Sequence, residues 1–89
     1  MKSRATARFW DLFRELPSDI QDQARQAYRL FMIDPKSPGL QFKRVSQKRP
    51  VYSARITRDH RALGILQREG ITWYWIGSHG DYDRILSGR

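Results

Sequence analysis

The chain has 89 residues, enough for one domain with a small hydrophobic core, so we expect a single domain over residues 1–89. It contains no cysteine, which excludes a disulfide framework and thiolate chemistry. The N-terminal Met1-Lys2-Ser3-Arg4 does not have the form of a signal peptide, and no apolar run is long enough to span a bilayer. These features predict a cytoplasmic protein that does not bind a membrane.

The formal net charge of +8 is concentrated in the middle of the chain. Between Gln41 and Arg61 there are seven lysines and arginines against the single Asp59, whereas residues 1–34 carry six basic and five acidic side chains. Such a basic block favours polyphosphate binding, because each neutralised phosphate releases counterions. The alternative is a solvated edge that only keeps the protein soluble. Aromatic residues among the cations favour nucleic acid, since exposed rings stack on unpaired bases.

Two helices are predicted in the first third of the chain, because apolar residues recur at helical spacing on either side of Pro17. The first apolar stripe consists of Phe9, Leu12, Phe13 and Leu16, and the second of Ile20, Ala24, Ala27, Tyr28 and Phe31. Ser18-Asp19-Ile20-Gln21 has the form of a capping box, and the second helix should end near Ile33, ahead of Pro35. The two helices should form a hairpin with one apolar face, and four rings are expected in the core: Phe9, Phe13, Tyr28 and Phe31.

After the turn-rich segment 34–39 the apolar residues alternate, which predicts four strands. The expected strands are Leu40–Val45, Val51–Thr57, Arg61–Gln67 and Ile71–Gly77. Their short connections allow only hairpins, so the last three should form an antiparallel meander. Helices followed by strands predict an α+β domain. In it, the N-terminal helical hairpin packs on one face of a four-stranded, mainly antiparallel sheet, and a short helix ends the chain.

An assumed strand register places the candidate site residues on one face of this sheet. Centring the turns on Glu69 and near Asp59 gives the pairs Gln67 with Ile71, Leu63 with Trp75, Arg61 with Gly77, Thr57 with Arg61, and Arg55 with Leu63. A ligand-binding face then carries Arg55, Arg61, Trp73 and Trp75. The opposite face carries the small residues Ala54, Ala62 and Gly64, which suit the close approach of helices, together with Ile56, Leu66, Ile76, Tyr52 and Tyr74.

The residue types on the ligand-binding face fit RNA cleavage without a metal. No cluster of Asp, Glu, His or Cys has metal-ligand spacing, and no Gly-rich phosphate loop or Ser/His/Asp arrangement is present, so no cofactor is expected. In such cleavage the RNA 2′-hydroxyl attacks its own phosphate, a base takes its proton, and an acid protonates the departing 5′-oxygen. Histidine suits the proton transfers, and the planar fork of arginine grips two phosphate oxygens.

His79 is the stronger histidine candidate, because it follows the last strand and lies beside Arg61 in the expected register. The alternative to a catalytic role is that His79 is a surface-turn or helix-capping residue. His60 is better explained as a turn residue with a local hydrogen bond. Tyr82 lies three residues after His79, so the two would share a face of a terminal helix. Tyr82 is therefore either a catalytic residue or a residue that packs this helix onto the sheet.

The segment Ser53-Ala54-Arg55-Ile56 and the following His60-Arg61-Ala62-Leu63 resemble the S-x-R-I...H-R-x-x segment of YoeB-like ribonucleases in the RelE/ParE toxin superfamily. The order of helices, strands and tail extends this resemblance over nearly the whole chain. It implies that Arg61 contacts the scissile phosphate. His79 and, less closely, Tyr82 correspond to the His-Tyr pair that closes the last strand.

The same resemblance makes Lys43, with Arg44 in reserve, the nearest match to the lysine or glutamate of the toxins' first strand. The chain departs from YoeB in having no acidic residue on that strand and no adjacent His-Tyr pair. Its W-x-W-I-G-S-H-x-x-Y-D form resembles instead the superfamily branch labelled RelE/ParE-like.

From the residues and the resemblance together, we expect the toxin of a type II toxin–antitoxin pair that cleaves mRNA on the ribosome. Arg61 would clamp the phosphate and His79 would act as acid or base, while four cations hold the RNA backbone: Lys43, Arg44, Arg55 and Arg58. The expected partners are a cognate antitoxin, in a hetero-oligomer, and mRNA with the ribosome. Two alternatives remain open, a ParE-like inhibitor of DNA gyrase and a nucleic-acid-binding module without catalysis.

Overall fold

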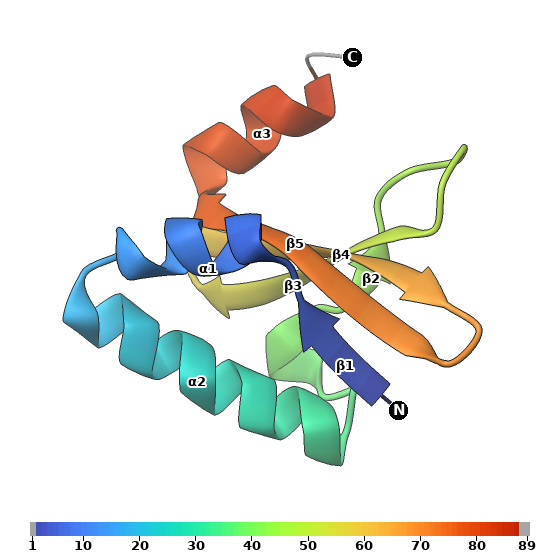
Figure 1. Cartoon of the computed structure of the whole chain (residues 1–89), viewed down its shortest axis with the longest axis horizontal. Helices are drawn as coiled ribbons and strands as arrows, with labels where there is room; N and C mark the ends of the chain where they lie inside the picture. Colours follow the sequence, from blue (N-terminus) through green and yellow to red (C-terminus); the bar gives the residue numbers. More distant parts are fainter. Residues whose placement is uncertain (1, 88–89) are drawn as a thin grey trace.

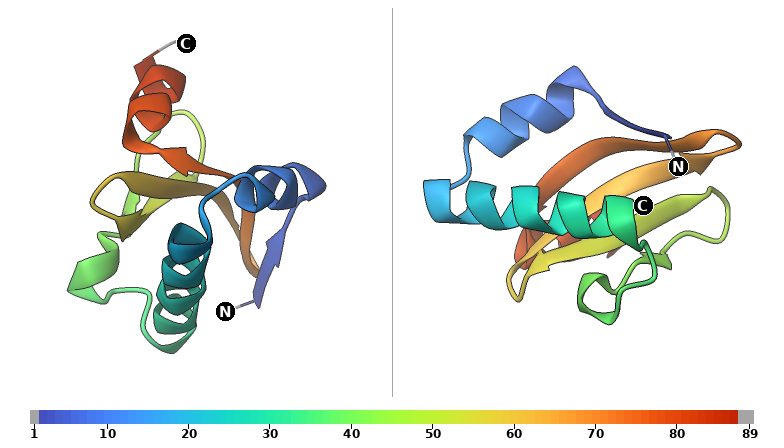
Figure 2. Two further views of the ribbon diagram at one scale, coloured as in Figure 1. Left: turned by 90° about the vertical axis from the view of Figure 1, so that its left-hand side faces the viewer. Right: turned by 90° about the horizontal axis from the view of Figure 1, so that it is seen from below.

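The computed structural model describes residues 2–87. Its helices are α1 (Ala7–Arg14), α2 (Ser18–Ile33), the 3-10 helix η1 (Pro38–Leu40) and α3 (His79–Ser87), and its strands are β1 (Lys2–Ala5), β2 (Lys43–Arg44), β3 (Val51–Thr57), β4 (His60–Gln67) and β5 (Gly70–Ser78). The strands form one sheet in the order β1-β5-β4-β3-β2 (Figure 1). Figure 2 shows this sheet between α2 on one side and α3 on the other. The α+β prediction is confirmed, and no helix within residues 2–87 is long and apolar enough to cross a membrane.

The helical hairpin turns at Pro17, as predicted, but the capping box does not form. Ser18 is the first residue of α2, Pro17 holds the N-cap position, and no side chain caps this helix. The Gln21 side-chain amide instead donates to the carbonyls of Phe13 (3.0 Å) and Leu16 (3.2 Å) at the end of α1. Gln21 therefore ties the first turn of α2 to the end of α1 and the link that follows it, in addition to the Leu16 N–H that donates to the Phe13 carbonyl.

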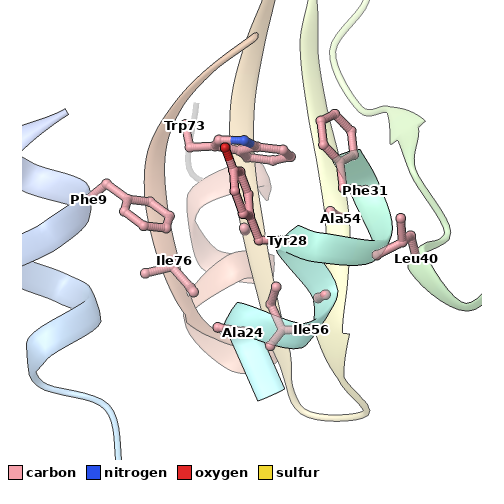
Figure 3. A pocket seen from close by; sticks show the side chains of 11 residues that line it. Phe9, Ala24, Tyr28, Phe31, Leu40, Ala54, Ile56, Trp73 and Ile76 are labelled. Carbon is pink, nitrogen blue, oxygen red and sulfur yellow. The ribbon is translucent and has the colours of Figure 1, made fainter. Parts of the chain in front are cut away.

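The main core lies between the helical hairpin and the sheet. Phe31, only 2% exposed, packs edge-on against Phe42 and Trp73, with ring centroids 5.1 and 5.3 Å apart. Ala54 and Ala62 pair across β3 and β4 and are buried in the same cluster, so their small side chains let α2 approach the sheet. An apolar cavity of about 50 Å³ remains there. Figure 3 shows side chains that line it. Tyr28, which the helical spacing predicts in the core, lines this cavity and is 45% exposed.

The sheet has a fifth strand that the sequence pattern does not predict. β1 pairs in parallel with β5 from Lys2 opposite Gly70 to Ala5 opposite Trp73. A Cβ atom at Gly70 would lie 1.9 Å from the Lys2 carbonyl oxygen, so only glycine permits this close approach. At the other edge, the predicted strand Leu40–Val45 shortens to β2, because residues 38–40 form the 3-10 turn and Gln41 adopts a φ of 45°.

Two register differences change which side chains share a face. The β4–β5 pairing agrees with the prediction at Arg61–Gly77 and Leu63–Trp75, but Gln67 pairs with Gly70 and the register shifts between Leu63 and Gly64. Tyr74 is the extra residue of this bulge, so Trp73 joins the core under the helices and Tyr74 joins the cluster on the opposite face. The predicted faces of both residues are wrong.

The β3–β4 pairing also differs from the prediction. Arg55 pairs with Arg61 and Thr57 with His60, which is a shift from the predicted partners Leu63 and Arg61. At Arg55 the partner moves by two residues, so Arg55 and Arg61 still share a face, as predicted. At Thr57 it moves by one, because the register shifts between Arg55 and Thr57.

Candidate active site

The face opposite the helical hairpin is covered in part by α3, which packs on a second apolar cluster. This cluster contains Val51, Leu63, Trp75 and Tyr82, of which Leu63 is fully buried. Trp73 and Trp75 are only 6% and 7% exposed. The expectation that these two indole rings belong to an exposed ligand-binding face is therefore wrong. The candidate site lies beside the N-terminus of α3, where the apolar cover ends.

Arg55 and Arg61 form a cross-strand pair on this face, and Gly77 continues the row on β5. A Cβ atom at Gly77 would lie only 2.7 Å from the Trp75 ring, so the ring leaves no space for a side chain at this position. The row therefore has no third side chain. Two like charges directly opposite each other destabilise a sheet. Within residues 2–87 neither arginine has an acidic partner, so a bound anion would relieve their repulsion.

Arg61 has a role in the β3–β4 turn that the sequence does not indicate. Its Nη1 donates to the carbonyls of Thr57 (2.7 Å), Arg58 (3.2 Å) and His60 (2.9 Å). These bonds fix the side chain and use one nitrogen of the guanidinium. The remaining donors, Nη2 and Nε, have no hydrogen bond within the described chain and suit a phosphate.

His79 is held at the β3–β4 turn by its backbone, and its ring contacts Asp83. Its backbone N–H donates to the carbonyl of Asp59 in the β3–β4 turn at 2.6 Å, and the preceding Ser78 pairs with His60 on β4. Its Nδ1 lies 3.1 Å from Oδ2 of Asp83, one helical turn along α3. This contact favours a proton on Nδ1 and leaves Nε2 free to exchange a proton with a ligand. The histidine side chain is 43% exposed, so a ligand can reach it.

Asp83 is a site residue that the sequence prediction does not include. The signal is present in the sequence, because residues four apart on a helix face each other and His79 begins the predicted terminal helix. The family resemblance indicates Tyr82 instead. Tyr82 is only 7% exposed and packs in the apolar cluster, with its ring centroid 5.5 Å from that of His79. This burial supports the packing role of Tyr82 rather than the catalytic one.

The predicted RNA-binding cations divide between the two faces. Lys43 pairs with Ser53, so the register places it on the site face with Arg55, whereas Arg44 pairs with Tyr52 and points to the other face. The Arg44 guanidinium folds onto its own loop, where Nε donates to the Ser46 carbonyl at 2.8 Å. Arg58 is exposed in the β3–β4 turn next to the site.

The other histidine, His60, is the first residue of β4 rather than the turn residue that the sequence predicts. It contacts Thr57, with 3.0 Å between Nδ1 and Oγ1, which is the local hydrogen bond predicted for it. Within residues 2–87 no group of three His, Cys, Asp or Glu side chains could hold a metal ion.

Comparison with known proteins supplies the family. The model of the ParE-like toxin domain matches residues 18–84, which include α2, β2 to β5 and most of α3. The chain belongs to the ParE-like toxin domain family. The match covers Arg55, Arg61, His79 and Asp83, and it places the chain in the RelE/ParE toxin superfamily that the sequence resembles. No curated protein matches the chain.

Solved toxin structures share the fold at low sequence identity. The YoeB/ParE toxin from Agrobacterium tumefaciens superposes with a TM-score of 0.70 and 18% identity, covering 89% of this chain and 99% of that one. The RelB–RelE antitoxin–toxin complex from Methanococcus jannaschii gives 0.72 and 12%, covering 89% and 94%. YafQ from Escherichia coli gives 0.67 and 12%, covering 91% and 96%. At these identities the likeness establishes the fold and leaves the chemistry to the site.

Proposed function

We propose that this ParE-like toxin is a metal-independent endoribonuclease that cleaves mRNA on the ribosome. The proposal is carried by one arrangement, in which Arg61 and His79 are both anchored at the β3–β4 turn, Arg61 through the carbonyls of Thr57, Arg58 and His60 and His79 through that of Asp59. Arg61 keeps guanidinium donors free there and faces the like charge of Arg55 across the strands. A charged fork and a proton-transfer group next to each other are what phosphodiester transesterification requires. The exposed Arg58 and the register of Lys43 place further cations around the same position.

In the proposed reaction the RNA 2′-oxygen forms a bond to the adjacent phosphorus as its proton leaves, and the bond from phosphorus to the 5′-oxygen breaks. The products are a 2′,3′-cyclic phosphate and a 5′-hydroxyl end. Arg61 binds two nonbridging oxygens and stabilises the extra negative charge of the phosphorane-like state. His79 carries out one of the two proton transfers at Nε2, while water carries out the other. Asp83 holds the ring in the orientation that presents Nε2.

The proposal includes a protein antitoxin as the regulatory partner. Three of the similar solved structures are RelB–RelE complexes, from Methanococcus jannaschii, Pyrococcus horikoshii and Escherichia coli. We expect an acidic segment of the antitoxin to cover Arg61 and His79, because the cations there attract it. The segment would not bind to Trp73 or Trp75, since both are buried in the toxin itself.

Mapping of RNA ends after induced expression tests the proposal. Wild-type toxin should produce new 5′-hydroxyl ends in mRNA, and His79→Gln should lower their yield by about a hundredfold or more because glutamine keeps the size but transfers no proton. Circular dichroism melting of both purified proteins checks that the fold is kept. A folded His79→Gln variant with full cleavage would remove the ribonuclease assignment.

A gyrase inhibitor is the second candidate, because the family model that matches the chain is described as ParE-like. Expression of a gyrase inhibitor would leave mRNA ends unchanged and would instead relax or break DNA. Supercoiling assays with purified gyrase and purified toxin separate the two activities. The third candidate, a binding module without catalysis, predicts RNA binding with neither RNA cleavage nor gyrase inhibition.

A further inference from the structure

A groove lies on the same face as Arg61, at the other end of α3. It has a volume of about 800 Å³ and runs between α3 and the loop of residues 45–50 that joins β2 to β3. Figure 1 shows this loop projecting from the sheet on the same side as α3. Lys48 and Arg49 of the loop, Tyr74 of β5 and Ile85 of α3 all line the groove. We call it the 45–50 groove.

The loop is held by its own hydrogen bonds. The Val45 N–H donates to the Val51 carbonyl (2.8 Å), the Arg49 N–H donates to Ser46 Oγ (3.2 Å), and the Pro50 carbonyl accepts from the Leu66 N–H on β4 (2.9 Å). Lys48 and Arg49 are exposed, and no acidic side chain among residues 2–87 pairs with them. The loop therefore holds two unneutralised cations beside the groove.

Tyr74 adds an aromatic ring between these cations and α3. It is the extra residue of the β5 bulge, which turns its side chain to the α3 face of the sheet. Burial raises the pKa of the Tyr74 hydroxyl, and the nearby Arg49 opposes this only in part. The phenol is therefore neutral at physiological pH. A neutral, partly exposed ring next to two cations is the combination that binds a base and its phosphates.

The strand register connects the 45–50 groove to the site at Arg61. Every second residue of β3 faces the site, which gives Val51, Ser53 and Arg55. Lys43 of β2 pairs with Ser53 and so lies on the same face. Val51 lines the groove, so Lys43 lies between Arg55 and the groove. Four residues of a strand span roughly 13 Å, so the cations of the two regions form one continuous track. One extended polyanion can contact both ends of it.

We propose that the 45–50 groove is a second subsite for single-stranded RNA, which takes the nucleotides next to those held at Arg61 and His79. Lys48 and Arg49 bind phosphates there, and Tyr74 stacks on a base with Ile85 on the other side. This inference rests on the proposed ribonuclease function. The groove would extend the site at Arg61 and His79 so that it holds a longer RNA. RNA fits better than an acidic peptide, because the track of cations runs through to the phosphate-binding Arg61.

The test measures binding of 2′-O-methyl RNA, which lacks the attacking hydroxyl, to the full chain by fluorescence anisotropy. A longer oligonucleotide should bind about tenfold more tightly than a trinucleotide. The double variant Lys48→Ala/Arg49→Ala should remove this difference and lower the salt slope by about 0.7 for each phosphate that is no longer neutralised. The matched control, Arg29→Ala/Lys36→Ala, removes the same charge from exposed residues of α2 and the turn after it, and should leave the difference intact.

The role of the ring is tested separately. Tyr74→Leu should weaken binding of the longer oligonucleotide about fivefold, whereas Tyr74→Phe keeps the stacking surface and should not change it. If Tyr74→Leu does not fold, the exposed Lys48 and Arg49 still provide the test. Equal affinity for both oligonucleotides, or an equal loss in the control pair, overturns the subsite. So does a groove that binds an acidic peptide but no RNA.

The two proposals fail in different ways. If the longer oligonucleotide binds more tightly through Lys48 and Arg49 but expression produces no 5′-hydroxyl ends, the subsite holds and the ribonuclease proposal falls. If mRNA is cleaved but length gives no advantage, the ribonuclease proposal holds and the subsite falls.

Discussion

The two faces of the sheet are built from alternating residues of the same strands, yet one face packs the core and the other carries the candidate site. Ala54 and Ala62 face the helical hairpin, where they are buried under the rings of the main core. Their neighbours Arg55 and Arg61 face the other way and oppose each other without an acidic partner within residues 2–87. The helical face therefore supplies most of the stability, and this allows the site face to keep charges that repel each other. Stability and function should then respond to different substitutions on the same strands.

The largest expected effect is on stability, at Phe31. Phe31→Ala removes a ring that is 2% exposed and packs on Phe42 and Trp73, so it should lower the free energy of unfolding by roughly 3 to 5 kcal/mol. Urea unfolding measures this loss. An equal loss of stability in Arg55→Ala would contradict the conclusion that the helical face supplies most of the stability.

Arg61→Ala should act on the reaction more than on the fold. The loss of a donor to the transition-state phosphate costs roughly 2.7 to 4 kcal/mol, or a hundred- to a thousandfold in cleavage rate. Arg68→Ala is the matched control, because it removes the same charge from the exposed turn between β4 and β5, at the other end of the hairpin from the site. Cleavage assays and melting curves on both variants give the answer, and equal rates in the two would exclude a phosphate clamp at Arg61.

A smaller effect is expected at Asp83. Asp83→Asn should lower the maximal cleavage rate about tenfold, equivalent to roughly 1.4 kcal/mol, with the Michaelis constant unchanged, because only the orientation of the His79 ring is lost. Asp81→Asn removes the same charge from α3 but disturbs only the pair with Arg84, so it should have no effect. Nitrogen-15 NMR of the imidazole should show the proton on Nδ1 in the wild type. A proton on Nε2 there would contradict the positioning role.

The smallest effect is expected at Tyr82. Tyr82→Phe keeps the ring that packs on Leu63 and Trp75 and removes one hydroxyl, so stability should change by less than about 1 kcal/mol and cleavage should be unchanged. Thermal melting and RNA-end mapping measure the two quantities. If cleavage fell as far as in His79→Gln, Tyr82 would regain the catalytic role that the family resemblance implies.

Local patterns in the sequence predict much of the fold. The helical spacing on both sides of Pro17 predicts α1 and α2, and the alternation after residue 50 predicts β3, β4 and β5 almost to their ends. The pairing of Arg61 with Gly77 and the proximity of His79 follow from the hairpins alone. These features depend on neighbours in the chain, which is why a single sequence can predict them.

The features that the sequence does not predict depend on distant residues. Lys2-Ser3-Arg4-Ala5 has no strand pattern of its own and pairs only with residues near the other end of the chain. The bulge at Tyr74 lies within Trp73-Tyr74-Trp75, where three aromatic residues in a row give no alternation to fix the faces. The contact of Arg61 with the turn carbonyls depends on the observed register, which differs from the one that the assumed turn centre gives.

The pairing of β1 with β5 has a consequence for the order of folding. Pairing residues 2–5 with residues 70–73 closes a loop that includes most of the chain, which costs more entropy than forming a hairpin. The β3–β4 and β4–β5 hairpins should therefore form first, and β1 should join the sheet last. During synthesis β1 leaves the ribosome long before its partner strand exists, and its backbone stays unpaired until β5 has followed. In pulse-labelled hydrogen exchange, the Thr6 amide, which donates to the Trp73 carbonyl, should become protected after the amides of the β4–β5 hairpin. The residues of the candidate site would then be assembled before the sheet is complete.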